Sequence, residues 1–369
     1  MAKELIKGNV AMAEAAIRAG LEAYFGYPIT PQTEVLEHLA RRMPELGRAF
    51  VQAESEVAAI NMVYGAACTG VRVMTSSSSP GVSLMQEGLS YIAGTEVPAV
   101  IINVMRGGPG LGNIAPAQSD YYQSVHGGGH GDYHPIVLAP ASVQESIDLT
   151  VLSFELAEKY RNLAFVLSDG SVGQMMEPAE LPPMQPIVKK NYDWAIGGKG
   201  TREKRILTSI YINPHDEEIA NLRMLQTWFE IKKKEVRYKE YYLDDAEFLV
   251  IGFGTSGRVA LSAVRKCREK GIKVGLLRPI TLRPFPDEVI IELAERVQGI
   301  LVVEMNQGQM LDDVMIAVGK KVPIEFYGRP GGVIPFPEDV ESEIERMVSA
   351  KLEIVNNPRV AWLDRMLHR

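Results

Sequence analysis

Long apolar runs alternate with amphipathic segments along the first 180 residues. Runs such as "VRVMT", "VPAVIINVMR" and "LAFVLSD" predict strands buried on both faces, and "QTEVLEHLARRM" and "SVQESIDLTVLSFELAEKYR" predict helices between them. Strands of this kind occur in parallel sheets that carry helices on both sides. We therefore expect an α/β domain with a doubly wound parallel sheet over residues 1–180. Its opening helix, "NVAMAEAAIRAG", is expected to be capped by Asn9 and to end at Gly20.

The alternation stops after residue 180 and resumes near residue 246. The intervening segment begins with the proline-rich "EPAELPPMQPIV" and ends with a highly charged helical pattern over residues 216–245. We interpret residues 181–245 as a connector and a charged arm that lies over a neighbouring subunit. Strand and helix patterns from "EFLVIGFG" onward predict a second, smaller α/β domain over 246–350, followed by a C-terminal tail, 351–369.

Composition narrows the range of partners. The chain has 369 residues and is 46% apolar, with 39 Lys plus Arg against 46 Asp plus Glu and a net charge of −7. No basic block is present, which argues against nucleic acid as a partner. The two cysteines, Cys68 and Cys267, lie in separate helical patterns and suggest neither a disulfide framework nor a metal cluster. We expect a cytoplasmic protein, since "MAKELIKGNV" lacks a signal core and no apolar run is long enough to span a membrane.

One buried-type helix begins with two carboxylates. The segment from Glu56 to Gly70, "EVAAINMVYGAACTG", is small and apolar nearly all round, and it follows Glu54 and Ser55. Acidic residues in a first turn complement the helix dipole, and serine is a good N-cap. For an arbitrary helix this explanation is sufficient, so the residues alone do not assign the carboxylates a chemical role.

Three turns that follow predicted strands are rich in glycine, hydroxyl and charged groups. They are "GYPITP", "TSSSSPG" and "RGGPGLGNIAPAQSD". Doubly wound sheets bind ligands at the carboxyl ends of their strands. In the first turn, Thr30 is placed either to contact a ligand or to cap the next helix. Arg106, which ends an apolar strand, pairs with an internal carboxylate or binds a substrate carboxylate bidentately, and the glycines after it favour the second role.

The stretch "GFGTSG", Gly252–Gly257, is a literal G-x-G-x-x-G between a strand and a helix, which suggests a dinucleotide site. The acidic residue expected at the end of the next strand is missing, and Arg278 stands there instead. This argues against NAD and leaves only NADP. A tight strand-to-helix turn is the favoured interpretation.

Two other patterns resemble metal motifs. His126, His130 and His134 are spaced four apart in "HGGGHGDYH", but four intervening glycines make a helix improbable, and a flexible active-site loop is favoured over zinc. "SDG", residues 168–170, with Asn191 further on, lacks the leading glycine of the signature that holds Mg²⁺ and thiamine diphosphate. We therefore reject it as such a site.

Several long motifs together resemble a known family. "GYPITPQTEVLEHLARRMPE", "QAESEVAAINMVYGA", "SLMQEG" and "RGGPGLGN…QSDYYQ…GGGHGDYHPIVLAP" are similar to the α-type subunit of 2-oxoacid:ferredoxin oxidoreductases, over nearly the whole chain. The 2-oxoisovalerate (3-methyl-2-oxobutanoate) branch resembles it most, with the 2-oxoglutarate branch near it. One departure is "SSSSPG", where relatives tend to carry a Thr-Ser-Gly-Pro-Gly-like run, and it bears on the wall of the pocket.

The resemblance implies an architecture and a reaction. The first domain would be the pyrimidine-binding type of thiamine enzymes, followed by a transketolase C-terminal-like domain. The chain would serve in oxidative decarboxylation of a 2-oxoacid to acyl-CoA and CO₂, with coenzyme A as co-substrate and ferredoxin as electron acceptor. Thiamine diphosphate would be shared with a β subunit that carries the diphosphate-binding domain, Mg²⁺ and a [4Fe–4S] cluster. Further γ and ferredoxin-like subunits and a dimer of such heteromers are also implied.

The same resemblance implies site residues. Thiamine enzymes hold a carboxyl group against N1′ of the aminopyrimidine, which favours the imino tautomer, and burial raises the pKa of such a carboxyl. The family motif places this glutamate nine residues before a glycine, and counting back from Gly65 gives Glu56, with Glu54 as the runner-up. Thr30 and Arg106 would bind the carboxylate of the 2-oxoacid.

The loop that matches the family contains Gln118, Asp120 and His126, to which we assign no role. Two alternatives stand beside the main interpretation: an NADP-dependent dehydrogenase that uses Gly252–Gly257, and a non-catalytic assembly subunit that uses residues 216–245 for contacts. A non-oxidative thiamine decarboxylase is a nearer variant, distinguished by the lack of an iron–sulfur cluster in its partner.

Overall fold

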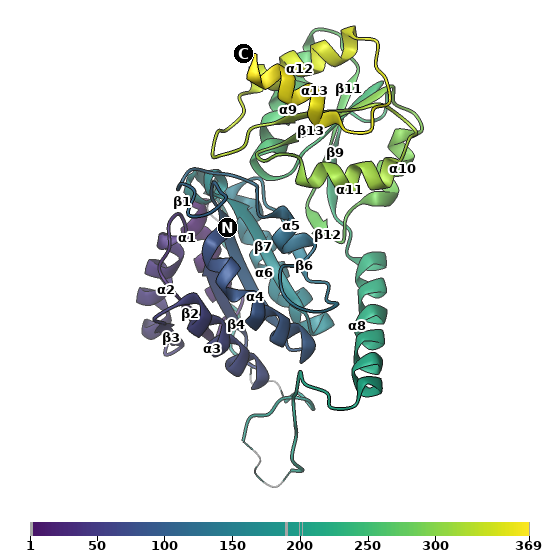
Figure 1. The fold of residues 1–369 in the computed structure, drawn as a ribbon. Helices are drawn as coiled ribbons and strands as arrows, with labels where there is room; N and C mark the ends of the chain where they lie inside the picture. The colour runs from purple at the N-terminus through teal and green to yellow at the C-terminus, as the bar shows by residue number, and fades with distance from the viewer. Residues whose placement is uncertain (1–2, 189–190, 199, 201, 369) are drawn as a thin grey trace.

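The computed structural model describes residues 3–188, 191–198, 200 and 202–368, and it contains two α/β domains (Figure 1). The first domain is built from the following elements: β1 (Glu4–Lys7), α1 (Gly8–Arg18), β2 (Ala23–Gly26), α2 (Thr33–Glu45), β3 (Ala49–Gln52), α3 (Glu56–Cys68), β4 (Val73–Ser77), α4 (Ser79–Gly94), β5 (Ala99–Met105), α5 (Tyr121–Val125), β6 (Ile136–Leu138), α6 (Val143–Tyr160), β7 (Leu163–Asp169), α7 (Gly170–Gln174) and β8 (Met176–Ala179).

The main sheet of this domain has the strand order β12-β6-β7-β5-β4-β2-β3. Strands β2 to β7 are mutually parallel, which confirms the doubly wound sheet. Alternate residues of β5 face opposite sides: Val100 and Ile102 pack in the core under α1, α2 and α6, and Ile101 packs in the core under α3 and α4. Covered on both faces, the sheet exposes its functional groups only at the strand ends.

Two local expectations differ from the structure. Asn9 does not cap α1, which begins at Gly8; its side chain instead donates to the Pro31 carbonyl at 2.6 Å and to the Glu34 carboxylate at 2.7 Å. The α3 helix is not buried all round, because Val57, Asn61 and Gly65 form an exposed stripe. Asn9 therefore ties α1 to the turn before α2, and α3 keeps one face open.

The second domain contains a five-stranded sheet of order β14-β13-β10-β11-β9, parallel except for β9 at its edge. Its elements, with β12 that joins the first sheet, are β9 (Tyr238–Tyr241), β10 (Phe248–Ile251), α9 (Gly254–Glu269), β11 (Val274–Pro279), β12 (Thr281–Arg283), α10 (Asp287–Ala294), β13 (Gly299–Glu304), α11 (Gln309–Val318), β14 (Ile324–Gly328), α12 (Pro337–Ser349) and α13 (Pro358–Leu367).

The charged arm forms the helix α8 (Pro214–Lys234), which stands along the side of the first domain in Figure 1. The helix ends at Lys234 instead of continuing to residue 245, and residues 238–241 join the second sheet as β9. Its inner face is fixed to the first domain by Trp228, whose ring lies 4.9 Å from that of His134. The loop after it is fixed by Glu235, which accepts from Lys159 at 2.7 Å.

A buried carboxylate joins the two domains. Asp169, at the carboxyl end of β7, accepts from the Thr255 amide at 2.9 Å and from the Thr255 hydroxyl at 2.7 Å. Thr255 lies in the first turn of α9, so the carboxylate of one domain satisfies the helix N-terminus of the other. The Asp169 carboxylate also accepts from the amides of Ser171 and Val172, in the first turn of α7.

Gln118 completes this contact. Its side chain is fully buried, accepts from Ser256 Oγ at 2.6 Å and from the Met305 amide at 3.0 Å, and donates to the Phe253 carbonyl at 2.9 Å. Its backbone carbonyl accepts from Asn306 Nδ2 at 2.7 Å. Gln118 is thus an interdomain residue, a role that the sequence did not assign.

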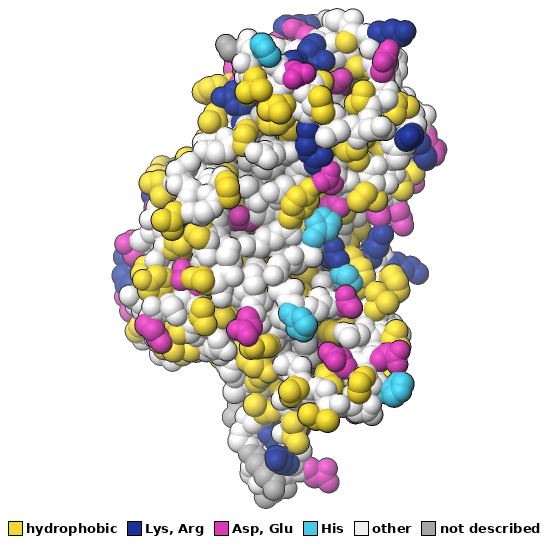
Figure 2. Space-filling view, viewed as in Figure 1, with side chains coloured by type: hydrophobic (Ala, Val, Ile, Leu, Met, Phe, Trp, Pro, Cys, Tyr) yellow, Lys and Arg dark blue, Asp and Glu magenta, His cyan; other side chains and the backbone are white. Residues whose placement is uncertain are grey.

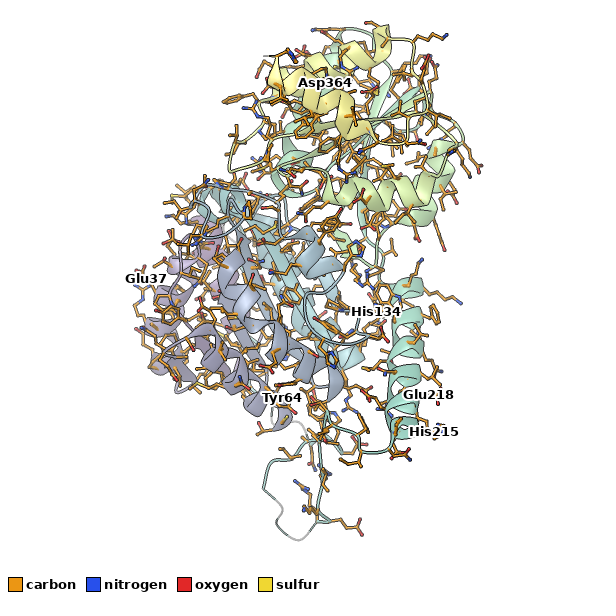
Figure 3. All side chains as sticks on the ribbon, viewed as in Figure 1. Glu37, Tyr64, His134, His215, Glu218 and Asp364 are labelled. Carbon is orange, nitrogen blue, oxygen red and sulfur yellow. The ribbon has the colours of Figure 1, made fainter. Side chains whose placement is uncertain are left out.

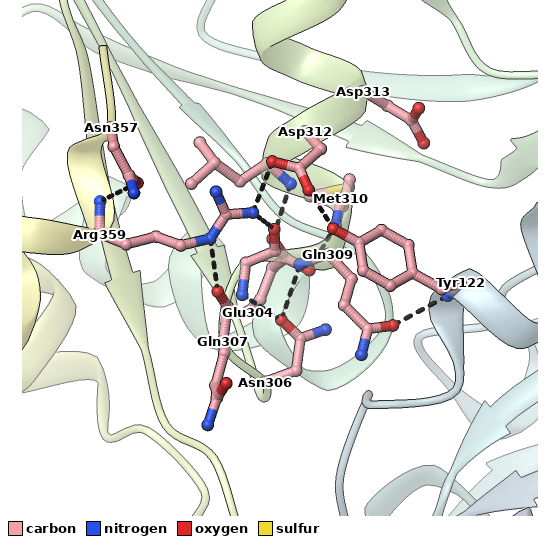
Figure 4. Close-up of polar contacts among 12 residues, drawn as sticks. Tyr122, Glu304, Asn306, Gln307, Gln309, Met310, Asp312, Asp313, Asn357 and Arg359 are labelled. Atoms are coloured by element: carbon pink, nitrogen blue, oxygen red, sulfur yellow. Dashed lines mark hydrogen bonds and ion pairs between the residues drawn. The ribbon is translucent and has the colours of Figure 1, made fainter. Parts of the chain in front are cut away.

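A second interdomain cluster surrounds the buried Glu304 (Figure 4). Its carboxyl accepts from the amides of Met310 and Leu311, both at 2.9 Å, at the start of α11. Burial raises the pKa of Glu304 to about 7, although these hydrogen bonds oppose the rise. Next to it, the Gln309 side chain reaches the Tyr122 amide of the first domain at 2.8 Å, so α11 is held against α5.

Among the described residues, no helix combines the length and apolar character needed to cross a bilayer. Both cysteines are buried and free. Within the same part of the chain, no three His, Cys, Asp or Glu side chains converge as metal ligands.

Replacing Asp169 tests the interdomain contact. In Asp169→Ala the amides at the start of both α7 and α9 lose their acceptor in a buried place, so we expect the free energy of unfolding to fall by about 3 kcal/mol. Denaturant unfolding monitored by fluorescence measures this loss. Asp148→Ala removes an exposed carboxylate on α6 and is the control, with an expected change within about 0.5 kcal/mol. Equal stabilities of the two variants would contradict the assignment.

Candidate functional site

The α3 helix begins as its sequence predicts. Ser55 is the N-cap, and its hydroxyl accepts from the Ala58 amide at 3.2 Å. Glu54 is exposed, whereas Glu56, the first helical residue, is only 6% exposed. Glu56, which the family motif selects ahead of Glu54, is thus the buried one of the two carboxylates.

Glu56 lies against the first turn of α4. A Cβ on Gly81 would lie 2.6 Å from Glu56 Oε1 and would overlap Ser77 Oγ. Among the described residues, none donates a hydrogen bond to the Glu56 carboxylate, and the buried Ser77 hydroxyl also lacks a partner. A mostly buried carboxylate without a donor, next to a buried hydroxyl without a partner, is typical of a site built for a polar ligand.

Thr30 and Arg106 meet at the same edge of the sheet. Arg106 Nη1 donates to the Thr30 carbonyl at 2.9 Å, and Nη2 donates to the Leu111 carbonyl at 3.1 Å. Arg106 Nε is buried and has no partner within the described chain. Thr30 is exposed and does not cap a helix, since α2 begins at Thr33. Two of the five guanidinium N–H groups are thus used, and the remaining ones on Nη1 and Nη2 are available to a ligand beside the exposed Thr30.

A polar network holds the backbone of Arg106. Its amide donates to Ser79 Oγ at 3.0 Å, and this hydroxyl donates to Asp120 Oδ2 at 2.5 Å. Asn103 Nδ2 donates to the same carboxylate oxygen at 3.0 Å, and Asn103 Oδ1 accepts from the Ser79 amide at 3.1 Å. Burial raises the pKa of Asp120, while the hydrogen bonds from Ser79 and Asn103 and the charge of Arg106 oppose it.

Ser79 connects the two parts of the site. It lies two residues before Gly81, which contacts Glu56, and its own hydroxyl contacts the Arg106 amide. Its φ of 23° is in a region where glycine is favoured over other residues. The "SSSSPG" departure therefore falls at the centre of the site. Asn103 was missed by sequence reasoning, although a polar residue inside the apolar run "AVIINVM" was a signal for it.

A cavity of about 740 Å³ opens next to this network, between the two domains. It is lined from the first domain by Ser79, Asp120 and the Gly107–Gly110 turn, and from the second by Asn306 and Gln309. Asp120 is the one charged side chain among its lining residues. The cavity thus has a mixed polar and apolar lining, and its lining residues include no cation.

The alternative motifs have other roles. The first turn of α9, within Gly252–Gly257, is filled by the Asp169 carboxylate, which leaves no free helix N-terminus for a dinucleotide phosphate. Arg278 is buried and lies 2.5 Å from Glu145 of α6. Both features serve the domain interface, and the favoured structural interpretation of "GFGTSG" is confirmed.

The three histidines do not converge. His126 lies 3.1 Å from Asp313 of α11, and His134 contacts Arg283 and packs with a tilted ring against Trp228. Burial and the Arg283 charge lower the pKa of His134 to about 4. His126 and His134 thus make contacts between elements, and Asp169 makes the interdomain contact described above.

Family models match both domains. Residues 14–244 match the thiamine-diphosphate-binding domain of pyruvate flavodoxin/ferredoxin oxidoreductases, and residues 246–340 match core domain II of pyruvate:ferredoxin oxidoreductase. The chain is a subunit of the 2-oxoacid:ferredoxin oxidoreductase family. The family resemblance that the sequence motifs carried is therefore confirmed.

Relatives of this oxidoreductase subunit agree with the assignment. It is 50% identical over 347 residues to the ketoisovalerate oxidoreductase subunit VorB of Methanothermobacter thermautotrophicus, covering 94% of this chain and 98% of that one. It is 35% identical over 370 residues to the 2-oxoglutarate synthase subunit KorA of Methanocaldococcus jannaschii, covering 93% and 100%.

Solved structures support the fold. The oxidoreductase subunit superimposes with a TM-score of 0.85 on 2-oxoglutarate:ferredoxin oxidoreductase from Magnetococcus marinus, solved with 2-oxoglutarate, coenzyme A and succinyl-CoA bound, at 29% identity. The match covers 94% of this chain and 65% of that one. A split-gene transketolase matches with a TM-score of 0.59 at 12% identity, which bears on the fold alone.

Adding one methyl group at Gly81 tests the geometry around Glu56. In Gly81→Ala the new Cβ would displace the Glu56 carboxylate and Ser77, so we expect at least a tenfold loss of 2-oxoacid oxidation by the purified complex, with dye reduction as the readout. Gly65→Ala adds the same methyl on α3, where nothing lies within 4 Å, and should leave activity unchanged. Equal activities in the two variants would show that the Glu56–Gly81 contact is irrelevant to the site.

Proposed function

We propose that this chain supplies the pyrimidine-binding half of the active site in an enzyme that oxidatively decarboxylates a branched-chain 2-oxoacid of the 2-oxoisovalerate type to acyl-CoA and CO₂. The observation that carries the proposal is the buried Glu56 carboxylate, which no described residue hydrogen-bonds, at the sheet edge where Arg106 keeps a buried N–H without a partner. We infer that the complex works in the cytoplasm with ferredoxin as acceptor.

Glu56 is the residue that would contact the cofactor. An acceptor carboxylate without a protein donor fits the N1′ edge of an aminopyrimidine, and the neighbouring Ser77 hydroxyl offers a further polar contact. When bound, thiamine diphosphate supplies the carbon nucleophile for the keto group. Glu56 would hold the proton shared between its carboxyl and N1′.

Arg106 and Thr30 are the residues for the substrate carboxylate. The unused Nη N–H groups of Arg106 lie beside the exposed Thr30, and the guanidinium is held in place by the Thr30 and Leu111 carbonyls. A fixed guanidinium orients a carboxylate, and hence the adjacent keto carbon, before reaction. The network of Ser79, Asp120 and Asn103 would fix the position of the Arg106 backbone, because the Arg106 amide donates to Ser79.

The cavity next to the site favours a substrate with a neutral side chain. A second carboxylate, as in 2-oxoglutarate, would enter a cavity whose lining carries Asp120 and no cation. A branched aliphatic side chain meets no such repulsion. The 50% identity to a ketoisovalerate oxidoreductase subunit, against 35% to a 2-oxoglutarate synthase subunit, supports the same choice.

The remaining parts of the reaction belong to partners. The described residues contain no metal-ligand cluster, so Mg²⁺ and the [4Fe–4S] cluster are assigned to a β subunit that carries the diphosphate-binding domain, with γ and ferredoxin-like subunits beside it. Coenzyme A, which the Magnetococcus structure holds, would be the acyl acceptor. The elements around the site expose apolar side chains that suit such a partner, namely Tyr27, Val57, Leu84 and Leu111.

Replacing Glu56 separates a catalytic subunit from an assembly subunit. Glu56→Gln keeps the size of the side chain but cannot share a proton with N1′, so we expect a loss of about 10²–10⁴-fold in kcat of the reconstituted complex. Glu54→Gln, an exposed change two residues away, should keep full activity. A fully active Glu56→Gln complex would instead support the non-catalytic assembly role.

Replacing Arg106 tests the substrate assignment. Arg106→Lys keeps the charge but loses the planar fork, so kcat/KM for 2-oxoisovalerate should fall about 100-fold, mainly through KM. In the unchanged complex, kcat/KM for 2-oxoisovalerate should exceed that for 2-oxoglutarate. Arg41→Lys, at an exposed position of α2, is the matched control. A preference for 2-oxoglutarate, or an unchanged KM in Arg106→Lys, would refute the assignment.

A further inference from the structure

The C-terminal helix α13 is fixed to the second domain near its start and at its centre. Asn357 caps the helix, and its side chain accepts from the Arg359 amide at 3.1 Å. The buried Trp362 donates its indole N–H to the Gly328 carbonyl at 3.1 Å, at the end of β14. The helix begins after residue 340, where the match to core domain II ends, so its contacts are additional to that domain.

Arg359 holds the segment that leads from β13 into α11, residues 306–309, which we call the 306–309 turn. Its Nε donates to the Gln307 carbonyl at 2.8 Å, and its Nη2 contacts the Gly308 carbonyl (Figure 4). The same Nη2 lies 2.6 Å from the Asp312 carboxylate. Because the guanidinium is a planar fork with N–H groups in fixed directions, it can bind two carbonyls and a carboxylate at once. Arg359 therefore fixes the shape of this turn.

The 306–309 turn contacts the first domain on both sides of Asp120. The Gln309 side chain donates to the Ser119 carbonyl at 2.8 Å and accepts from the Tyr122 amide at 2.8 Å. The Tyr122 hydroxyl also contacts the Asp312 carboxylate, to which the guanidinium binds. Figure 2 shows the two domains packed directly against each other, and these bonds are part of that contact. The second domain thus holds the backbone on either side of Asp120.

Asp120 connects this backbone to the residue proposed to bind the substrate. Its carboxylate accepts from Ser79 Oγ at 2.5 Å, and the same hydroxyl accepts from the Arg106 amide at 3.0 Å. A displacement of Asp120 would therefore move Ser79 Oγ, which is the acceptor that holds the Arg106 backbone. The contacts form one continuous path from α13 to Arg106, and such a path is a physical basis for coupling between distant residues.

We propose that Arg359 is a positioning residue for the 2-oxoacid substrate. By fixing the 306–309 turn, Arg359 holds Asp120 in place. Through Ser79, this placement keeps Arg106 oriented toward the substrate carboxylate. The inference rests on the proposed function, which assigns Arg106 to that carboxylate. Because a displaced guanidinium binds the carboxylate less well, loss of Arg359 should raise KM more than it lowers kcat.

Amide hydrogen exchange tests the path without reference to the reaction. In the full complex, Arg359→Ala should raise the exchange rate of the Tyr122 amide at least tenfold, because its acceptor on Gln309 is no longer held. Arg359→Lys keeps a charge near Asp312 but cannot bind both carbonyls, so it should raise this rate less. Asp364→Ala removes an exposed carboxylate from the same helix (Figure 3) and should leave exchange unchanged. Unchanged exchange of the Tyr122 amide in Arg359→Ala would overturn the proposal.

Kinetics of the reconstituted complex separate positioning from a purely structural role. Arg359→Ala should raise KM for 2-oxoisovalerate about tenfold and lower kcat by less than about threefold, whereas Asp364→Ala should change neither. Asp120→Asn should also raise KM. Adding Arg359→Ala to Asp120→Asn should raise KM by less than about twofold further, because both changes act on the same contact.

The combined variant decides whether Arg359 acts through Asp120. If the effects of Arg359→Ala and Asp120→Asn on KM multiply, the arginine acts independently of Asp120 and the proposal is wrong. A lowered kcat with unchanged KM in Arg359→Ala would contradict it as well. If the native complex oxidises no 2-oxoacid, the proposed function itself is wrong, and this inference is wrong with it. Normal oxidation with multiplied effects would overturn this inference alone.

Discussion

The whole arrangement depends on one buried carboxylate at a domain boundary. Asp169 ends the interior strand β7 and satisfies the amide groups that open both α7 in its own domain and α9 in the other. Gln118 closes the same contact from the loop that also carries Asp120. Because each group is buried, leaving any one unpaired is costly, and the relative placement of the domains is fixed. The interdomain cavity keeps its shape for the same reason.

Because the domain boundary is fixed, the polar groups that this chain contributes to the site are held in position. Glu56, Gly81, Ser79 and Arg106 come from three different elements, yet one turn of α4 touches them all. The positive φ of Ser79 places its hydroxyl against the Arg106 amide, whereas a regular helix start would direct this hydroxyl elsewhere. The site therefore has its polar groups placed before any ligand arrives, and the cost of ordering them is met by folding.

Much of this could be predicted from the sequence, and the limits have a physical cause. Continuous apolar strands gave the parallel sheet, and the rule that ligands bind at strand ends brought Thr30 and Arg106 to one edge, where they do meet. The helix pattern after Ser55 assigned neither carboxylate a role, and the family motif selected Glu56, but only the fold shows that Glu54 is exposed and Glu56 is not. The roles of Gln118, Asn103 and Asp169 depend on contacts between residues far apart in the chain, which no local period records. The end of α8 was misplaced because its charged pattern continues into an edge strand that is also charged and half-exposed.

The path of the chain through β12 has a consequence for how the protein is divided. After α8 the chain enters the second domain, returns at Thr281–Arg283 to pair antiparallel with β6, and then leaves again for α10. Where the chain passes between the domains, the Arg237 amide donates to Thr281 Oγ1 at 2.8 Å. This bond joins the segment that enters the second domain to the segment that returns from it. A gene split between the domains would thus strip the first sheet of its outer strand and leave β6 as an open edge, which invites aggregation. The two domains share one continuous core cluster and one strand, so the chain folds as one piece.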